Sequence, residues 1–388
     1  MVTHGGHGET VRVAIVTESF LPATNGVTTS VLRVLDHLAA RGHQAMVVCP
    51  GPAPAHYAGF PVREVTSFTF QGFRAAVPSP LLARHLDEFR PDVVHAAAPF
   101  ALGYQALLLA RRRAVPTVAI FQTDIARFAL KYGLVGTEWA SWRWVRTVHD
   151  QADLTLAPSS AALHDLHTNG VARTRTALWG RGVDAVTYHP RHRATAAGQA
   201  LREELLRGTP AGTALVGYVG RLAPEKRVER LAALEGLGVR LAIVGDGPSR
   251  SALERKLTNA VFLGKRTGEE LARCYAALDV FVHTGIHETF GQTLQEAMAS
   301  GVPVVAPAAG GPLDVVAPGE TGYLYGPEDD ADLRSAVAAL SAPDAAARRA
   351  QMGEAGRRRV LPRSWEALGE TLLEHYAAVA DATPVLSR

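Results

Sequence analysis

The sequence predicts an α/β protein that consists of two doubly wound units, each with a parallel β-sheet. Short, continuous apolar runs alternate with amphipathic stretches, and such runs are typical of parallel strands buried on both faces. The alternation stops at a polar stretch, residues 190–198, and resumes at Ala214. A length of 388 residues exceeds one ordinary core. We expect a first domain over residues 1–185, a second over 186–364 and a final helix over 365–388.

The composition is that of a globular protein and excludes several classes of function. Hydrophobic residues make up 47% of the chain, and 40 Lys and Arg against 37 Asp and Glu give a net charge of only +3, so we expect no nucleic-acid binding. The two cysteines are far apart and fit a reducing cytoplasm. Neither a signal peptide nor an apolar stretch long enough to cross a membrane is expected.

Two arginine runs are candidates for contact with a membrane. Arg111 to Arg113 and Arg357 to Arg359 could lie on anionic lipid, which would place the protein at the inner face of the plasma membrane. Solvated helix ends explain both runs as well.

The strands of the first unit are predicted from its apolar runs. They cover Val11 to Thr17, Ala45 to Cys49, Pro91 to His95, Val115 to Ile120 and Leu154 to Ser159, and helices are expected between them, the first over Thr28 to Ala40. A glycine-rich crossing, Trp179 to Asp184, is the expected hinge.

Two loops of this unit are candidate ligand sites. Asn25-Gly26 follows the first strand, and a glycine there permits close approach of a ligand to the backbone. The full G-x-G-x-x-G of nicotinamide dinucleotide sites is absent, and a plain turn is the alternative. Gln122 and Asp124 follow the strand that ends at Ile120, at the edge where open α/β sheets place ligands. They are candidate sugar or acceptor contacts, although Asp124 could equally cap the next helix.

The second unit repeats the pattern. Its predicted strands cover Ala214 to Val219, Leu241 to Val244, Val261 to Gly264, Asp279 to His283, Val302 to Ala306 and Gly322 to Leu324, and Trp365 to Ala380 reads as the final amphipathic helix.

Cations in the loops of the second unit suit a nucleotide. Arg221 and Lys226 stand five positions apart after the first strand, as a planar fork and a point charge that suit a diphosphate. The alternative is a solvated loop with an Arg–Glu pair. Gly245 belongs to an incomplete glycine motif, and the turn around Arg266 could read the edge of a base.

The strand from Asp279 runs into a helix predicted over Phe290 to Ser300. Its first amides, from Thr289 to Gln292, lack intrahelical partners and carry the positive end of the helix dipole, which makes an anion site. Glu288 precedes these amides and suits a group beyond the phosphate, whereas Glu296 suits a ribose diol. Either glutamate alone would more often decorate a surface helix.

Several motifs together resemble one family from end to end. NGV, FQTD, GRLAPEK, VGDG and HETFGQTLQEAMASGVPVVAPAAGG are similar to the motifs of family 4 retaining glycosyltransferases, which have the two-Rossmann GT-B fold. The stretches AIVTESFLPATNGVTTSVLRVLDHL and APSSAAL more closely resemble actinobacterial GDP-mannose-dependent α-mannosyltransferases that build glycolipids. The resemblance implies two Rossmann-like domains facing a cleft, with the C-terminal helix crossing back to the N-terminal domain.

The resemblance also implies roles for single residues. Arg221, Lys226, Glu288 and Asp124 would be catalytic. Arg221, Lys226 and Glu288 would also bind the donor. The other donor contacts would be Gly26, Gly245, Arg266, Glu296 and the amides of Thr289, Phe290 and Gly291. The acceptor would be bound by Asn25, Gln122 and Asp124. Many members carry His at the position of Gln122, and Asp124 or Gln122 would have to substitute for it.

The implied reaction moves mannose from GDP-mannose to a hydroxyl of a lipid-linked or polyol acceptor. Arg221, Lys226 and the amides would stabilise charge on the departing diphosphate, so neither a cofactor nor a metal is required. Attack would come from the front face, with the departing phosphate taking the acceptor proton. The alternatives are a UDP- or dTDP-sugar donor and a non-catalytic protein that binds sugar nucleotides.

Overall fold

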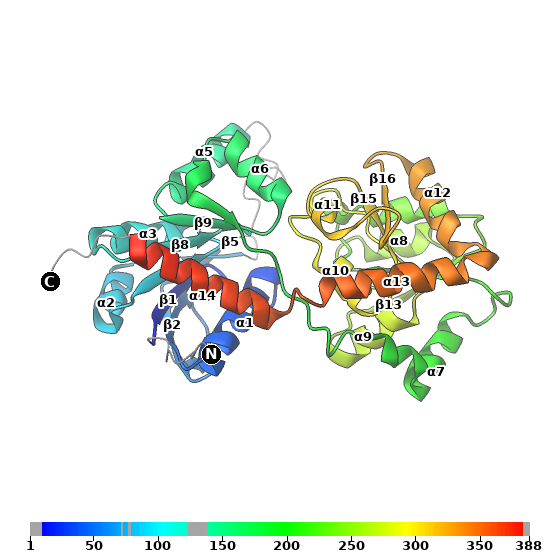
Figure 1. Cartoon of the computed structure of the whole chain (residues 1–388), viewed down its shortest axis with the longest axis horizontal. Helices are drawn as coiled ribbons and strands as arrows, with labels where there is room; N and C mark the ends of the chain where they lie inside the picture. Colours follow the sequence, from blue (N-terminus) through cyan, green and yellow to red (C-terminus); the bar gives the residue numbers. More distant parts are fainter. Residues whose placement is uncertain (1–9, 71–72, 77–78, 123–137, 383–388) are drawn as a thin grey trace, which may run out of the picture. The chain divides into compact units, whose positions relative to one another are not determined.

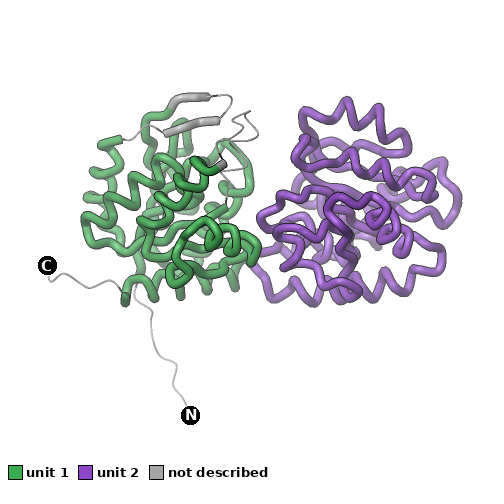
Figure 2. The backbone as a smooth tube through the Cα atoms, turned by 90° about the horizontal axis from the view of Figure 1, so that it is seen from above, with its two compact units in different colours: residues 1–180, 365–388 green, residues 181–364 purple. Residues whose placement is uncertain are grey.

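The computed structural model describes residues 10–70, 73–76, 79–122 and 138–382, and these fall into two compact units (Figures 1 and 2). One unit comprises residues 1–180 and 365–388, and the other comprises 181–364. The chain passes into the second unit five residues before the boundary predicted from the sequence. The reason is that Val183 belongs to the second core, where it also bridges to Ser364.

The first unit is built on an eight-stranded sheet in the order β10-β9-β8-β7-β1-β2-β4-β3. All its pairs are parallel except β3 with β4. The strands are β1 (Arg12–Thr17), β2 (Gln44–Pro50), β3 (His56–Tyr57), β4 (Phe60–Val65), β7 (Val93–Ala97), β8 (Thr117–Ile120), β9 (Leu154–Ala157) and β10 (Thr176–Leu178), and β5 (Ser67–Phe70) and β6 (Phe73–Ala76) form a separate hairpin.

Helices cover both faces of this sheet. They are α1 (Gly26–Ala40), α2 (Pro80–Phe89), α3 (Ala101–Arg112), α5 (Glu138–His149), α6 (Ser160–Thr168) and α14 (Trp365–Ala382), with the short η1 (Arg173–Arg175). The continuous apolar run of β1 explains the arrangement, because Val13 and Ile15 pack on one face and Ala14 and Val16 on the other. The first face is covered by α1 and α14, and the second by α2 and α3.

The C-terminal helix returns to the first unit, as predicted (Figure 1). The hydroxyl of Tyr376 on α14 lies 2.6 Å from Nδ1 of the buried His95 on β7. The indole of Trp179 donates to the carbonyl of Leu368 at 3.0 Å. The helix is therefore fixed at both ends of its buried face.

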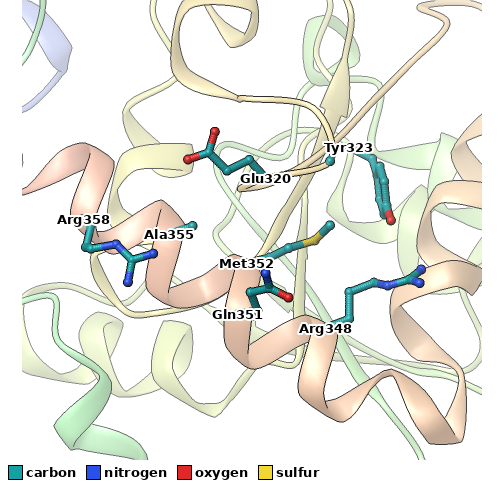
Figure 3. A pocket seen from close by; sticks show the side chains of 8 residues that line it. Glu320, Tyr323, Arg348, Gln351, Met352, Ala355 and Arg358 are labelled. Atoms are coloured by element: carbon teal, nitrogen blue, oxygen red, sulfur yellow. The ribbon is translucent and has the colours of Figure 1, made fainter.

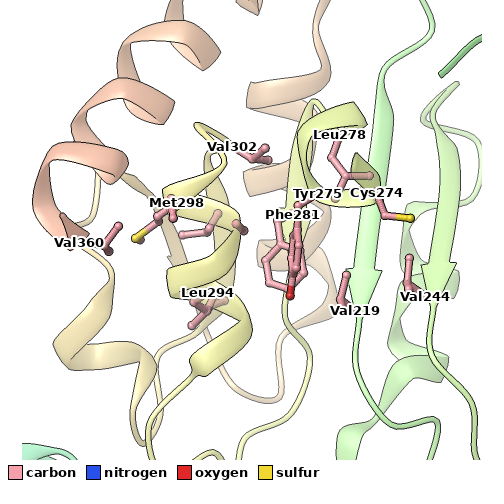
Figure 4. Close-up of a cluster of buried hydrophobic side chains, with 14 of the residues drawn as sticks. Val219, Val244, Cys274, Tyr275, Leu278, Phe281, Leu294, Met298, Val302 and Val360 are labelled. Carbon is pink, nitrogen blue, oxygen red and sulfur yellow. The ribbon is translucent and has the colours of Figure 1, made fainter. Parts of the chain in front are cut away.

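The second unit has six parallel strands in the order β13-β12-β11-β14-β15-β16. They are β11 (Leu215–Val219), β12 (Arg240–Val244), β13 (Ala260–Gly264), β14 (Val280–Val282), β15 (Val304–Pro307) and β16 (Gly322–Tyr325). The helical segments are η2 (Pro190–Ala194), α7 (Ala196–Leu205), η3 (Pro224–Lys226), η4 (Val228–Leu234), α8 (Arg250–Lys256), α9 (Gly268–Ala277), α10 (Gln292–Ala299), α11 (Pro312–Val315), α12 (Asp330–Ser341), η5 (Pro343–Ala345) and α13 (Ala346–Val360). On one face of the sheet, side chains of β11, β12 and β14 pack against α9, α10 and α13 (Figure 4).

Both units are doubly wound, and each therefore has a point where the strand order reverses. In the first unit the reversal lies between β1 and β7, and in the second between β11 and β14. Open α/β sheets bind ligands at the carboxyl ends of the strands at such a point. The loops that follow β11 and β14 are thus the first place to look for a site.

Within the described residues, no helix combines the length and the apolar character needed to cross a lipid bilayer.

Several expectations about single elements were wrong or incomplete, and the short strands β3, β5, β6 and β10 were not predicted. The sequence did not predict β4, because this strand near the edge of the sheet buries only Val62 and Val65 and lacks a continuous apolar run. Helix α1 begins two residues earlier than expected, because Asn25 caps it. Helix α10 begins at Gln292 rather than Phe290, because Gly291 has left-handed backbone angles (φ 97°, ψ 49°).

We predict that Asp279→Ala destabilises the second unit. The Asp279 carboxylate is 5% exposed and accepts from the Leu215 amide at 2.8 Å and from Arg193 and Arg202 at 2.7 Å each. Its loss leaves a buried amide and two guanidinium groups without their acceptor, so the free energy of unfolding should fall by about 2–4 kcal/mol.

Urea unfolding followed by circular dichroism measures this change, because all five tryptophans (139, 142, 144, 179 and 365) lie in the first unit and do not report on the second. The control is Glu254→Ala, which removes an exposed pair with Arg250 and should change the stability far less. Equal effects of the two substitutions on the free energy of unfolding would contradict a stabilising role of the buried Asp279 contacts.

Candidate active site

The loops after β11 and β14 meet at the strand-order reversal of the second sheet. The first loop contains the short helix η3, which ends at Lys226, and the second runs from His283 to Gly291. The hydroxyl of Thr284 donates to the carbonyl of Lys226 at 2.6 Å. This contact between a side chain and a backbone carbonyl joins the two loops.

An ion pair between Lys226 and Glu288 forms the centre of the site. Nζ of Lys226 lies 2.8 Å from Oε2 of Glu288, and both side chains are largely buried. Burial by itself would raise the pKa of Glu288, but Lys226, with smaller contributions from His283 and Arg181, lowers that pKa to about 2. The structure therefore brings together two predicted site residues that are 62 positions apart.

The amides next to Glu288 donate no hydrogen bond within the described part of the chain. They belong to Thr289, Phe290, Gly291 and Gln292, and Gly291 is the N-cap of α10. The side chain of Phe290 is buried in the core, so only its backbone can contact a ligand. The helix start thus has N–H groups that an anion could accept from.

A third loop, which follows β15, contacts this segment, and the sequence did not predict that contact. The amide of Gly311, after β15, donates to the carbonyl of Glu288 at 2.7 Å. A Cβ at Gly311 would come within 2.3 Å of the backbone carbon of Phe290. Glycine is therefore needed for the close approach that holds Glu288 in place, and the Gly-Gly pair after the strand was the available signal.

Glu296 lies two turns further along the chain and has a different environment. The hydroxyl of Tyr275 on α9 donates to Oε2 of Glu296 at 2.8 Å, and Gln292 and Tyr188 also hydrogen-bond to its carboxyl group. Burial outweighs these bonds and raises the pKa of Glu296 to about 7. The rings of Tyr188 and Tyr275 meet edge to face at 5.6 Å. The carboxyl group is thus held in a fixed position and is near its titration point at neutral pH.

Three residues of the site were missed by sequence reasoning. His283 lies with Nε2 at 3.7 Å from Oε2 of Glu288, but the sequence showed it only as the end of an apolar strand. Tyr275 looked like an ordinary core residue of a helix. Arg181 was part of the glycine-rich crossing, and the charge of Glu288 raises its pKa against the effect of burial, which lowers that pKa to about 10.

Arg221 lies on the same loop as Lys226 but stands apart from the ion pair. Its side chain is 59% exposed and lies 3.9 Å from Glu225, four positions on. This is the weak Arg–Glu contact that the alternative interpretation anticipated. Within the described residues, no ion pair joins Arg221 to Glu288.

The other predicted donor contacts have structural reasons of their own. Gly245 has φ of +135°, and a Cβ there would come within 1.9 Å of the carbonyl oxygen of Gly220, so this glycine lets two loops pack together. Arg266 is exposed and lies 3.6 Å from Glu270. Neither residue contacts the ion pair.

In the first unit, Asn25 is the N-cap of α1. Its Oδ1 accepts from the amides of Val27 and Thr28 at 3.0 Å each, and its Nδ2 donates to Ser19 at 2.7 Å. Gly26 is the first residue of the helix. Gln122 is buried just beyond β8, and Asp124 lies outside the described residues.

A separate pocket of about 440 Å³ opens on the second unit between α13 and the segment around β16 (Figure 3). It is lined by Gly319, Glu320, Tyr323, Arg348, Gln351, Met352, Ala355 and Arg358. None of the site residues predicted from the sequence lines it. Across the described part of the chain, no three His, Cys, Asp or Glu residues are grouped closely enough to hold a metal ion.

Comparisons with known proteins identify the family and the fold of this chain. The family model Glycosyltransferase Family 4 matches residues 24–186, and the model Glycosyl transferases group 1 matches residues 206–359. A GDP-mannose-dependent alpha-mannosyltransferase of Mycolicibacterium smegmatis is 47% identical, over 95% of this chain and 98% of the relative. A protein of the same description from Mycobacterium tuberculosis is 46% identical, over 95% and 97%. The crystal structure of Anabaena HepE in complex with UDP matches with a TM-score of 0.76 at 21% identity, over 95% of this chain and all of that one, and shows the same fold.

We predict that Glu296 makes the second unit less stable as the pH rises. The folded state keeps the Glu296 proton up to its pKa of about 7, whereas the unfolded chain releases it near the ordinary value of 4.5. Stability is therefore lost between these two values. The free energy of unfolding of the wild type, measured relative to Glu296→Gln, should fall by about 2 kcal/mol from pH 5 to pH 8.

The control is Glu288→Gln under the same conditions. The pKa of Glu288 is lowered to about 2, so its contribution to stability is fully present above pH 4.5 and is lost only as the pH falls further. The difference between the wild type and this variant should stay constant from pH 5 to pH 8. A constant difference for Glu296→Gln as well would show that Glu296 titrates normally.

Proposed function

Because this chain belongs to glycosyltransferase family 4, we propose that it transfers mannose from GDP-mannose to a hydroxyl of a lipid-linked or polyol acceptor, with retention of configuration. Two relatives that are 46% and 47% identical over nearly their whole length carry the description GDP-mannose-dependent alpha-mannosyltransferase, which supports mannose as the sugar.

The observation that carries this proposal is the pairing of Lys226 with Glu288 beside amides that donate no hydrogen bond to any residue that the structure describes. A diphosphate needs positive charge and N–H donors, and Lys226 and the amides from Thr289 to Gln292 supply both. Glu288 adds an acceptor for hydroxyl groups directly next to them. A nucleotide sugar carries its groups in the same order, because the hydroxyl groups of the sugar follow directly after the diphosphate.

The remaining donor contacts follow from the same placement. Glu296 would accept from the ribose hydroxyls. Arg221 is exposed and held only by a contact of 3.9 Å to Glu225, so it can turn toward the phosphates at little cost. Gln122 and Asp124, beyond the end of β8, are proposed to contact the acceptor.

The proposed reaction needs no nucleophile from the protein. The bond between the anomeric carbon and the β-phosphate oxygen breaks, and the acceptor oxygen bonds to that carbon on the same face. The acceptor proton passes to the departing phosphate, and GDP leaves. Lys226, Arg221 and the helix amides stabilise the charge on the leaving oxygen, and in this proposal no metal ion takes that role.

We place the reaction in the cytoplasm, where lipid acceptors would be presented at the inner face of the plasma membrane. Both cysteines, Cys49 and Cys274, are buried and reduced. Arg111 and Arg112, exposed at the end of α3, are the cations that would face anionic lipid. By contrast, Arg357 and Arg359 donate to carbonyl groups of their own unit and are less suited to that role.

We predict that Glu288→Ala and Lys226→Ala each lower the turnover number at least about 100-fold, because each removes a group that contacts the sugar or the leaving diphosphate. Products are measured by mass spectrometry after incubation with GDP-mannose and a pooled extract of lipids and aminocyclitols, which also identifies the acceptor. Glu203→Ala and Lys256→Ala, on exposed helix positions, are the matched controls. Turnover like that of the wild type in both site variants, with the fold intact, would exclude this site.

We predict that GDP stabilises the protein more than UDP or dTDP does. A nucleotide present at a hundredfold its dissociation constant stabilises the folded state by about 2.7 kcal/mol. When the three nucleotides are used at one concentration, the thermal shifts therefore rank their affinities. A larger shift with UDP or dTDP would favour the second candidate, a transferase that uses another nucleotide sugar. That candidate remains open because Arg266, proposed to lie at the base, makes only a weak surface pair.

A further inference from the structure

His283 occupies a position where a purely structural residue would be apolar. It follows the buried strand β14, is only 3% exposed, and neither of its ring nitrogens has a partner at hydrogen-bond geometry within the described residues, although the backbone of Gly285 lies near enough to raise the pKa of His283 slightly. A buried polar group without a partner costs about 1–3 kcal/mol. The three residues before it, Val280 to Val282, are all apolar.

The backbone of His283 is fixed from both sides. Its amide donates to the carbonyl of Val305 on β15 at 2.8 Å, and its carbonyl accepts from the hydroxyl of Tyr325 on β16 at 3.1 Å. The imidazole therefore projects from a rigid point at the strand-order reversal. Rigid placement of this kind is what a residue that orients another group requires.

The ring lies next to the central ion pair. Nε2 is 3.7 Å from Oε2 of Glu288, the same oxygen that accepts from Lys226 at 2.8 Å. A Cβ at Gly285 would lie 3.4 Å from Nε2 and 3.5 Å from Cδ of Lys226, so the glycine leaves space beside both side chains. A shift of less than 1 Å would bring Nε2 within hydrogen-bond distance of Glu288.

The imidazole can contribute a hydrogen bond rather than a charge. Burial, together with the charge of Lys226, lowers the pKa of His283 to about 4, and Glu288 raises it only in part. At neutral pH the ring is uncharged and has one N–H to donate.

Lys226 has two negatively charged groups to neutralise. Without ligand it holds Glu288, and with a donor bound it must also neutralise a diphosphate. As its charge turns to the phosphates, Glu288 loses its strongest partner, and a largely buried carboxylate needs another donor.

We propose that His283 is a positioning residue, whose imidazole N–H holds Glu288 oriented toward the transferred sugar while Lys226 binds the diphosphate. This inference rests on the proposed function. It adds a residue that acts through Glu288 and does not touch the reacting atoms.

A matched pair of substitutions tests the proposal. His283→Met and His283→Gln are similar in length, but only Gln keeps an N–H donor. We expect His283→Met to lower kcat by about 10- to 100-fold while the Kd for GDP stays within about twofold, and His283→Gln to recover kcat to within about fivefold of the wild type. His192→Phe is the control for a buried histidine of the same unit, because His192 bonds to the carbonyl of Thr187, away from this site. It should lower the melting temperature and keep kcat.

The contribution of the sugar to binding is measured without turnover. The ratio of Kd for GDP to Kd for GDP-mannose should fall about tenfold in His283→Met and much less in His283→Gln. A wild type that binds GDP-mannose and transfers nothing would refute the proposed function, and this ratio would still decide the role of His283.

Three results would overturn the role of His283. The first is a kcat and a Kd ratio unchanged in His283→Met. The second is Gln performing no better than Met. The third is failure of both His283→Met and His283→Phe to fold, which would assign the residue to structure alone.

Discussion

The ion pair between Lys226 and Glu288 joins the two loops at the point where the strand order of the second sheet reverses. A largely buried carboxylate is tolerated only with a partner, and removing one partner of a buried pair typically costs about 3–5 kcal/mol. The pair therefore fixes the relative position of the loops after β11 and β14. That position in turn sets the direction of the amides at the start of α10, because Glu288 directly precedes them. Gly311 holds the same segment through the Glu288 carbonyl, so side chain and backbone are fixed independently.

Each sheet has its own point where the strand order reverses, but the helix starts at these two points differ in how their amides are capped. In the first unit, Oε1 of Glu18 accepts from the amides of Phe100, Leu102 and Gly103 at 2.7–3.2 Å, at the start of α3. A carboxylate of the protein thus already satisfies the helix start at that reversal. In the second unit, the amides before α10 have no such cap within the described residues. Because an anion is attracted to N–H groups that lack partners, this asymmetry favours the second unit as the one that binds a diphosphate.

The sequence predicted most of the fold and the two principal residues of the site, but not their contacts. Buried parallel strands appear as continuous apolar runs, so all strands of the second sheet could be located. Strand β4, next to the edge strand β3, has only two buried side chains and left no such run. Lys226 and Glu288 stood out as charged residues in the loops that follow apolar strands. His283 and Tyr275 did not, because each lies in an apolar stretch and the folded structure alone shows that they lie next to Glu288 and Glu296. The exposure of Arg221 agrees with the alternative that the sequence left open, a solvated loop with an Arg–Glu pair.

The two glutamates show how one short segment can hold carboxyl groups in opposite states. Glu288 lies beside Lys226, which outweighs burial and lowers the pKa of Glu288 to about 2, so this carboxylate stays ionised. Among the described residues, the donors to Glu296 are the neutral groups of Tyr275, Gln292 and Tyr188, and burial raises the pKa of Glu296 to about 7. Two full negative charges on either side of a diphosphate would repel it. Because Glu296 is partly neutral near pH 7, it could exchange hydrogen bonds at a lower electrostatic cost with the ribose diol that we propose it binds. The charge of Glu288 is offset by Lys226, which lets the second carboxyl group lie close to an anion site.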